Sequence, residues 1–447
     1  MPKSRGNHAV VLGAGMAGLA TAQVLSHHFS KVTVLERDQF PEEPVPRSGT
    51  PQAAHAHALL GGGLHALQSL FPDFGQDLVT AGAVQTRAGI EIRLERPGFD
   101  PFPSRDLGFD IFFMSRPLLE AVTRRRVRDS PNIAIKTRHR ATQIIASSST
   151  LRVEGVRCDG EDGRSHTIDA DFVAEATGRG SLTLQLLERL GLQRPEETEI
   201  GIDQAYSTTI VERPHDREAS WDGVMFLPSA PESSRGGFVF PIEKQQWIVS
   251  IGGNHGDVPP GDWEGLLDFV KTLRTSTIHD ALKNARPKSG IARFRLPASV
   301  RRHFERLDTF PTGLLAIGDA ICRFNPVFGQ GMSVATREAV VLDSLLQDDV
   351  PTDRLAEQFF TRIQPTIETP WGVAQSDFVY PATRGVRPAD FEKRTQYNIG
   401  LTRLAAQDSE VHKLLAEVQN LLKPQSALRE PALATRVMAV MGREPVS

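Results

Sequence analysis

The sequence predicts an α/β protein with a second, β-rich part and a helical C-terminal region. Near the N-terminus, a strand (8–12), a helix (16–25) and a second strand (31–36) follow one another within about 30 residues, which is the length of a βαβ unit. Between residues 200 and 252, apolar and polar residues alternate as in half-buried strands. Residues 411–422 place their apolar side chains on one face at helical spacing, which indicates core or a dimer contact.

Composition narrows the class of protein. The 447 residues are 40% hydrophobic and 23% charged, so the chain is long enough for two joined domains or one large enzyme unit. A net charge of -3 gives no general attraction to nucleic acid or acidic membranes. The two cysteines, Cys158 and Cys322, are far apart, which favours a reducing, cytoplasmic compartment over a disulfide framework. No apolar run approaches the roughly 18 residues of a membrane helix.

The remaining elements follow from local pattern. Residues 116–129 are expected to form a helix with Ser115 as its N-cap. Short strands are expected at 133–137, 141–147, 151–158, 165–170 and 172–176, with a hairpin turn at 159–163. Strands at 200–212, 223–227, 236–242 and 247–252 form a separate sheet, and 314–317 is another buried strand. The stretches 40–63 and 97–108 are largely loop, although 59–70 could be helical, and helices fill much of the remainder.

The first βαβ unit carries a G-x-G-x-x-G motif formed by Gly13, Gly15 and Gly18. In such a motif the first glycine permits a tight turn, the second lets the backbone approach a pyrophosphate, and the third lets helix and strand pack closely. The helix that starts at Met16 and Ala17 then presents its N–H groups and positive dipole to the phosphates. Glu36 ends the second strand, where its carboxylate can accept hydrogen bonds from ribose hydroxyls. The motif therefore predicts a Rossmann-type dinucleotide site.

Two later motifs indicate which dinucleotide binds. Gly318-Asp319 follows a buried strand, and an N-P-V-F-G-Q-G-M segment begins at Asn325. This arrangement resembles the flavin-binding motif of the class A flavoprotein monooxygenases, the p-hydroxybenzoate-hydroxylase-like family. Thr177-Gly178 begins a T-G-R-G-S segment that is similar to one in related flavin epoxidases and geranylgeranyl reductases. The resemblance covers roughly residues 9–339 and implies non-covalent FAD.

The resemblance also implies site residues. Asp319 would bind the ribitol and pyrophosphate, Arg116 and Arg47 would lie near the flavin chain, and the segment from Pro326 would lie beneath the isoalloxazine. The residues expected to contact FAD are Gly13, Gly15, Met16, Ala17, Gly18, Glu36, Arg37, Arg47, Arg116, Thr177, Gly178, Gly318, Asp319, Pro326, Gly329, Gly331 and Met332.

The electron source stays open. The family's usual Asp-Gly pair, which is linked to both FAD and NADPH, is replaced here by Thr177-Gly178. No second G-x-G-x-x-G exists, so NAD(P)H would bind transiently or a partner flavin reductase would supply electrons.

Catalytic residues are not identified, because an oxygenated flavin can act on a substrate without a protein acid or base. His57, ahead of His55, is a candidate for the surroundings of the flavin, with a structural histidine as the alternative and no metal site expected. Phe238 and Phe240 occupy the place of the halogenase W-x-W-x-I-P signature and are candidates for the substrate pocket; ordinary sheet core is the alternative.

The predicted fold is α/β, with a Rossmann-type FAD-binding domain (1–85, 106–180 and 305–345), a β-sheet substrate domain (86–105 and 181–304) and a helical C-terminal region (346–447). The resemblance implies a monooxygenase that uses a flavin C4a-hydroperoxide to hydroxylate or epoxidise a sizeable apolar metabolite with molecular oxygen. The alternatives are a geranylgeranyl-reductase-like flavin reductase and a cyclase or scaffold in which FAD is structural.

Overall fold

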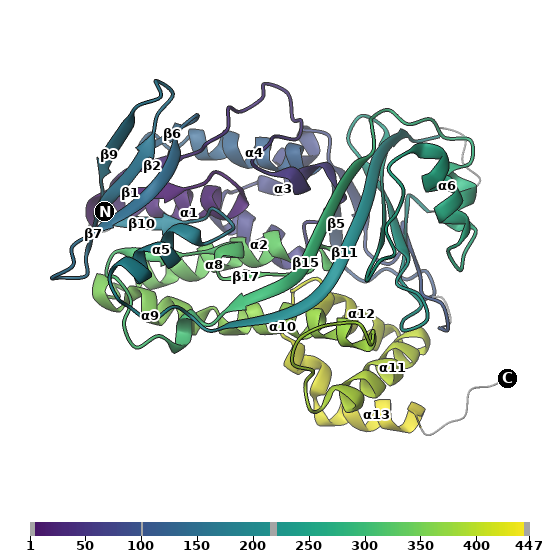
Figure 1. Ribbon diagram of the computed structural model, residues 1–447. Helices are drawn as coiled ribbons and strands as arrows, with labels where there is room; N and C mark the ends of the chain where they lie inside the picture. The colour runs from purple at the N-terminus through teal and green to yellow at the C-terminus, as the bar shows by residue number, and fades with distance from the viewer. Residues whose placement is uncertain (1–4, 100–101, 215–220, 442–447) are drawn as a thin grey trace.

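We call the part of the molecule that the sequence predicts to bind FAD the FAD-binding part. A parallel sheet forms its centre (Figure 1). The computed structural model describes residues 5–99, 102–214 and 221–441. The sheet has five strands in the order β16-β10-β1-β2-β6, and every neighbouring pair is parallel. Its strands are β1 (Gly6–Leu12), β2 (Phe29–Leu35), β6 (Ile133–Lys136), β10 (Phe172–Glu175) and β16 (Leu314–Ala316).

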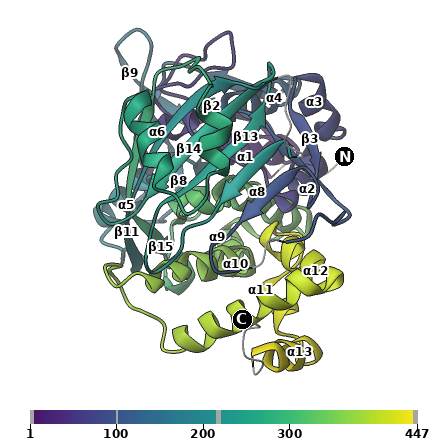
Figure 2. The same ribbon diagram turned by 90° about the vertical axis from the view of Figure 1, so that its right-hand side faces the viewer.

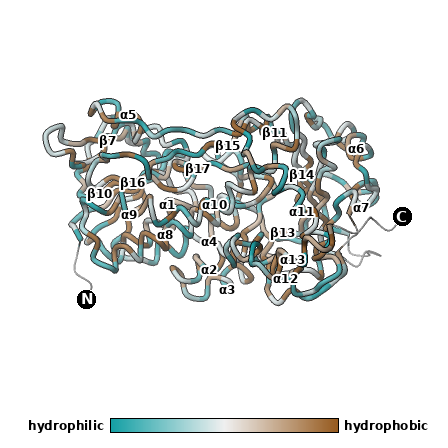
Figure 3. Tube along the Cα trace, turned by 90° about the horizontal axis from the view of Figure 1, so that it is seen from below, coloured by the Kyte–Doolittle hydropathy of each residue, from teal (hydrophilic) through white to brown (hydrophobic). Residues whose placement is uncertain are grey.

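Apolar residues on alternate sides of β1 bury both faces of this sheet. Ala9 and Val11 face the helices, whereas Val10 and Leu12 face a small antiparallel sheet. The helices on the first side are α1 (Met16–Ser26), α2 (Gly61–Leu70), α3 (Phe74–Thr80), α4 (Arg116–Arg128) and α8 (Gly331–Gln347). The second side holds β7 (Arg140–Ala146), β8 (Val153–Asp159), β9 (Ser165–Asp169) and α5 (Ser181–Arg189). Figure 3 shows brown, hydrophobic stretches along β10, β16 and α1, in agreement with this burial.

A seven-stranded sheet forms the second part, in the order β17-β15-β11-β14-β13-β12-β4. Its strands are β4 (Ile92–Glu95), β11 (Glu197–Glu212), β12 (Gly223–Phe226), β13 (Gly236–Ile242), β14 (Gln246–Gly253), β15 (Ala292–Arg302) and β17 (Cys322–Arg323). The long strands β11 and β15 run from this sheet towards the FAD-binding part (Figure 1). The short pair β3 (Val84–Arg87) and β5 (Asp110–Phe113) lies between the two parts.

Helices cover one face of the seven-stranded sheet. Val239, Trp247 and Val249 pack there against α6 (Trp263–Lys271) and α7 (Thr277–Leu282), and Figure 2 shows α6 in front of β14. We call the opposite face, which carries Phe294, Tyr206, Thr208, Ile210, Ile248, Ser250, Phe238 and Phe240, the inner face. The inner face contacts the FAD-binding part, because Phe240 packs on Phe113 and Thr208 is hydrogen-bonded to His55.

The C-terminal region is helical. It comprises α9 (Thr352–Arg362), α10 (Gln364–Ala374), α11 (Phe391–Gln407), α12 (Ser409–Gln419) and α13 (Pro431–Met441). Val411, Leu415 and Val418 are buried in a cluster with side chains of α11 and α13, so the predicted apolar stripe is core. No helix in the described ranges combines the length and the apolar character that crossing a membrane requires.

The predicted α/β class is confirmed, and most predicted strands lie within two residues of their observed bounds. The prediction missed β15, which it left among the helices. Phe294, Leu296 and Ala298 alternate there with Arg293, Arg295 and Pro297, so the period of two was present. Of the predicted helices, 116–129 is confirmed as α4, and Ser115 Oγ accepts the Leu118 amide as its N-cap.

Candidate active site

The first glycine motif forms a tight turn with one open position. Gly13 has φ +96°, and a Cβ at Gly18 would lie 1.9 Å from the Gly13 carbonyl oxygen. A Cβ at Gly15 would meet nothing within 4 Å. Gly15 caps α1 without a side-chain hydrogen bond, and the first turn holds no acidic residue. Gly13 and Gly18 therefore shape the turn, whereas Gly15 leaves room at a helix N-terminus for an anionic ligand.

Glu36 lies directly beside this turn and is 5% exposed. Its Oε2 accepts the Ala14 amide at 2.9 Å, and its Oε1 accepts the Asp38 amide at 3.0 Å. A carboxylate offers about four lone-pair positions, so acceptor capacity remains for ribose hydroxyls. The sequence predicted Glu36 as a ligand but missed that it also braces the Gly13 turn.

Arg47 is at the centre of a buried ionic cluster next to Glu36. Its Nη1 lies 2.8 Å from Asp38 and 3.2 Å from Glu36, and its Nε lies 3.4 Å from Glu120. Glu120 also pairs with Arg116 at 2.8 Å, which links the two arginines that the resemblance places near the flavin. The sequence did not single out Asp38 and Glu120, although an acid two residues beyond Glu36 was a usable sign.

Arg37, another member of the predicted set, lies at the exposed edge of this cluster. Its side chain is 56% exposed, and its Nε is 3.9 Å from Asp38. Together with Arg47 and Phe40 it lines an open concavity of about 460 Å³.

The second and third motifs meet at Asp319. A Cβ at Gly178 would lie 3.9 Å from Asp319 Cβ, and one at Gly331 would lie 3.6 Å from Asp319 Oδ1. Gly318 has φ +68°, and its Cβ would lie 2.9 Å from the side chain of Ala17. Burial raises the pKa of Asp319, while the charges of Arg116 and Arg323 oppose that rise. The structure therefore brings all three motifs together at the start of α1 and α8.

Thr177 has a structural partner. Its Oγ1 donates to Glu175 Oε1 at 2.8 Å, and Glu175, which is fully buried, accepts the amides of Leu182 and Thr183 at the start of α5. Thr177 thus closes a capped turn at the place where the family's usual Asp would stand.

The loop before α8 is fixed from several directions. Asn325 caps the 3-10 turn Pro326–Phe328 by accepting the Val327 amide, and its Nδ2 donates to Asp377 Oδ2 at 3.1 Å. Gly329 has φ +66°, and a Cβ there would lie 3.5 Å from Ala58. Pro326 is exposed and Met332 is buried. The buried Gln330 Oε1 has no hydrogen-bond partner among the described residues, which leaves an acceptor at the start of α8.

The two predicted histidines have different surroundings. The His55 ring is buried between Tyr206 and Phe294, and its Nδ1 is hydrogen-bonded to Thr208 at 2.7 Å. His57 Nδ1 donates to the His55 carbonyl at 2.8 Å. Burial, followed by the charge of Arg116, lowers the pKa of His57 to about 3, and burial lowers that of His55 to about 4. Both imidazoles are therefore neutral at pH 7, and His57 is the one beside Arg116.

Phe238 and Phe240 both lie on the inner face, with their ring centroids 5.5 Å apart. Phe240 is 4% exposed and packs on Phe113 at 4.8 Å, whereas Phe238 is half-buried. Both belong to a cluster that includes Ala56, next to the two histidines. Phe240 therefore has a core position, and Phe238 is the more accessible of the pair.

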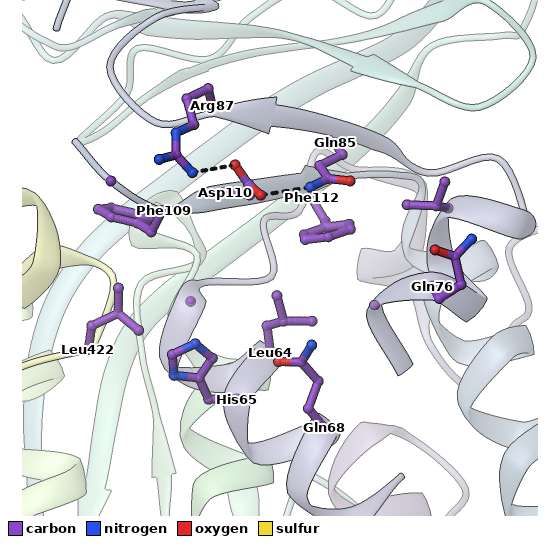
Figure 4. A pocket seen from close by; sticks show the side chains of 14 residues that line it. Leu64, His65, Gln68, Gln76, Gln85, Arg87, Phe109, Asp110, Phe112 and Leu422 are labelled. Carbon is purple, nitrogen blue, oxygen red and sulfur yellow. Dashed lines mark hydrogen bonds and ion pairs between the residues drawn. The ribbon is translucent and has the colours of Figure 1, made fainter. Parts of the chain in front are cut away.

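A polar pocket of about 480 Å³ lies on the other side of β5 (Figure 4). Asp110 accepts from Gln85 at 2.7 Å and from Arg87 at 3.0 Å at its rim. Phe112 lines this pocket, whereas its neighbour Phe113 points to Phe240, because successive strand residues face opposite sides. The pocket is thus separated from the inner face by the strand itself. In the described ranges, no three His, Cys, Asp or Glu side chains are grouped to hold a metal ion.

These features fit FAD. Gly15 and the uncapped start of α1 leave room for phosphates, and Asp319 lies beside Gly331, which follows the unpartnered Gln330. Such features suit a dinucleotide whose phosphates meet a helix N-terminus.

Comparison with known proteins agrees. Residues 114–350 match the family described as "FAD binding domain". Protein Rv3254 of Mycobacterium tuberculosis is 34% identical over 342 residues, which cover 74% of this chain and 71% of that protein. The chain therefore belongs to the FAD binding domain family and is an FAD-dependent oxidoreductase.

Solved structures share the fold. The flavin-dependent brominase Bmp2 superposes with a TM-score of 0.68 at 14% identity, covering 97% of this chain and 98% of the brominase. The p-nitrophenol 4-monooxygenase PnpA from Pseudomonas putida superposes with a TM-score of 0.65 at 18% identity, covering 94% and 99% of the two chains. The predicted class A flavoprotein monooxygenase fold is thus confirmed.

Proposed function

We propose that the protein is an FAD-dependent monooxygenase that inserts one oxygen atom into a sizeable, mostly apolar metabolite by hydroxylation or epoxidation. The observation that carries this proposal is the composition and position of the inner face. Half-buried Ile210, Met225, Phe238 and Phe294 form its surface. The inner face is turned towards His55 and Ala56 and, at Tyr206, towards Val327 in the loop before α8. Apolar side chains with a few placed polar groups are typical of small-molecule sites between domains.

The chain's own residues have distinct tasks in this proposal. Gly15 and the start of α1 bind the phosphates, and Glu36 and Asp319 accept hydrogen bonds from sugar and ribitol hydroxyls. Arg116 balances negative charge near Asp319 and His57. Bound FAD supplies the redox and oxygen chemistry, and neutral His57 adds no positive charge that would compete with Arg116.

The inner face has the task of excluding water from the substrate. Most of its buried polar groups are already paired, since Thr208 bonds both His55 and Ser250. The buried Tyr206 hydroxyl is the exception, with no hydrogen-bond partner among the described residues. A substrate without many polar groups therefore leaves few hydrogen bonds unmade on this face. NAD(P)H or a partner flavin reductase supplies the electrons.

Oxygen labelling tests the proposal. Under ¹⁸O₂ and with a reductant, the purified holoprotein should consume oxygen in a substrate-dependent way and place one labelled atom in the product. Reduction of a substrate double bond without oxygen uptake would instead indicate a flavin reductase. Flavin that stays oxidised with every reductant would indicate a structural cofactor. Either result contradicts the monooxygenase.

A further inference from the structure

A buried carboxyl group lies behind the second glycine motif. Glu338, on α8, has 0% exposure. Its Oε2 accepts the Gly318 amide at 2.7 Å. Its Oε1 is buried and has no hydrogen-bond partner within the described residues. Glu338 therefore makes one specific contact, and that contact is with the backbone N–H of Gly318, the residue directly before Asp319.

Gly318 is confined from two directions. Its left-handed φ of +68° is held on one side by the bond to Glu338. On the other side it abuts Ala17 of α1, which a Cβ would approach to 2.9 Å. The next residue, Asp319, lies beside Gly178 and Gly331. A change in the Gly318 peptide would therefore move Asp319 relative to both of these turns.

We propose that Glu338 is a positioning residue of the FAD site, which fixes the Gly318 peptide and thereby aims the Asp319 carboxylate at the flavin side chain. This inference rests on the assignment of Asp319 to FAD under the proposed function. Glu338 itself does not touch the cofactor, since its free oxygen is buried inside the protein.

The protonation of Glu338 agrees with this role. Burial raises its pKa to about 8, with the charge of Asp319 adding to the rise and the Gly318 amide opposing it. The Cys322 thiol lies near Glu338 and Asp319, and burial raises its pKa well above the usual range. At pH 7 the neutral Glu338 thus adds no second negative charge beside Asp319.

The stability of the protein should follow the same titration. In the unfolded chain Glu338 ionises near pH 4.5, whereas in the fold it stays neutral up to about pH 8. Between these pH values Glu338 is ionised in the unfolded chain but neutral in the fold. The free energy of unfolding therefore falls as pH rises from about 4.5 to about 8. FAD affinity should then fall as pH rises through about 8, because ionised Glu338 repels Asp319 and the phosphates.

FAD titration of the apoprotein tests the inference. Glu338→Gln keeps an oxygen that accepts the Gly318 amide, and its Kd for FAD at pH 7 should stay within about twofold of wild type. Glu338→Leu removes the acceptor and should raise Kd about tenfold. In an Asp319→Ala background, Glu338→Leu should add less than about twofold, because two residues that act through one contact are not additive. Asp343→Leu, on the same helix but paired with His28, is the matched control and should leave Kd unchanged.

The outcomes separate the two assignments. If Asp319→Ala leaves Kd unchanged, the assignment of Asp319 to FAD fails, and with it this inference. If Asp319→Ala weakens binding but Glu338→Leu does not, or the two effects add fully, only the role of Glu338 is wrong. If Glu338→Leu does not fold, the pH profile decides: Kd should rise between pH 7 and 9 in wild type and rise less in Glu338→Gln. Identical profiles would overturn the proposal.

Discussion

The two ends of the proposed flavin site are built in different ways. The adenosine end uses residues close together in the sequence: the Gly13 turn, Gly15, Gly18 and the braced Glu36 all lie within one βαβ unit. The ring end is assembled from distant segments, with Ala58 against Gly329, Asn325 against Asp377, and His55 against Tyr206. A local motif thus determines the first end, whereas side-chain packing across domains determines the second.

The largest expected effect lies within the local end. Gly18→Ala would place a Cβ 1.9 Å from the Gly13 oxygen, and we expect it to lower the free energy of unfolding. The loss should be about 3 kcal/mol or more, since neither backbone can yield easily. Gly15→Ala, in open space, should leave apoprotein stability unchanged and weaken FAD binding at least about tenfold. Thermal unfolding and FAD titration of both variants measure this; equal stability of the two would contradict the division of roles.

At the assembled end, Phe240 and Phe238 sharpen the comparison. Phe240→Ala empties a core position and should destabilise the protein by roughly 3–4 kcal/mol in urea unfolding. Phe238 is half-buried, so Phe238→Ala should lower the free energy of unfolding by about half as much. Phe238→Ala should also release more reducing equivalents as hydrogen peroxide, because the substrate is held less closely. If Phe238→Ala keeps full coupling between flavin reduction and product formation, the substrate does not contact this strand. FAD binding by both variants is the control.

Glu36→Ala should have a smaller effect. Removing its carboxylate deletes charge-assisted hydrogen bonds, so FAD affinity should weaken by roughly 1.5–3 kcal/mol. The apoprotein should also unfold at a lower temperature, since the Ala14 and Asp38 amides lose their acceptor. Glu36→Gln is the matched variant and should retain part of the FAD affinity and part of the thermal stability. Unchanged affinity in Glu36→Ala would show that the ribose contact is elsewhere.

The smallest expected effect is a pH dependence at the ring end. Burial raises the pKa of Asp377 to about 6, against an unfolded value of 3.8, while Asn325 opposes the rise. Folding stability is therefore lost as pH rises from about 4 to about 6. Asp377→Asn should remove this loss. The stability that the variant gains over wild type should be roughly 1–3 kcal/mol larger at pH 7.5 than at pH 4.5. Chemical denaturation of both proteins at the two pH values measures this difference. An equal stability change at both pH values would show that burial does not destabilise the ionised Asp377.

The comparison also explains what the sequence could predict. The spacing of Gly13, Gly15 and Gly18 and the buried strands on either side are local, so the central sheet was predicted closely. The strand β15 was missed although its apolar residues alternate, because a proline such as Pro297 inside a run argues against a strand. In the structure Pro297 falls opposite an irregularity between Gly201 and Gln204, where a missing N–H removes no ladder bond.

The ring end could be predicted only in part. The sequence named His55 and His57 but could not assign them, because Thr208 fixes the His55 ring and Arg116 lowers the pKa of His57, and both partners are far away in the chain. Tyr206, Asp377 and Glu338 were missed for the same reason: each is defined by a partner that only the fold brings near.

The order of strands in the central sheet also affects how the protein is made. β1 and β10 lie side by side, and β10 pairs on its other edge with β16, which comes about 140 residues later in the chain. During synthesis, the growing chain therefore exposes an unpaired edge of β10 until β16 and α8 have left the ribosome. At roughly 5–20 residues per second this interval lasts several seconds or more. The complete site for FAD forms only after this interval, because Asp319 and α8 follow β16 in the chain.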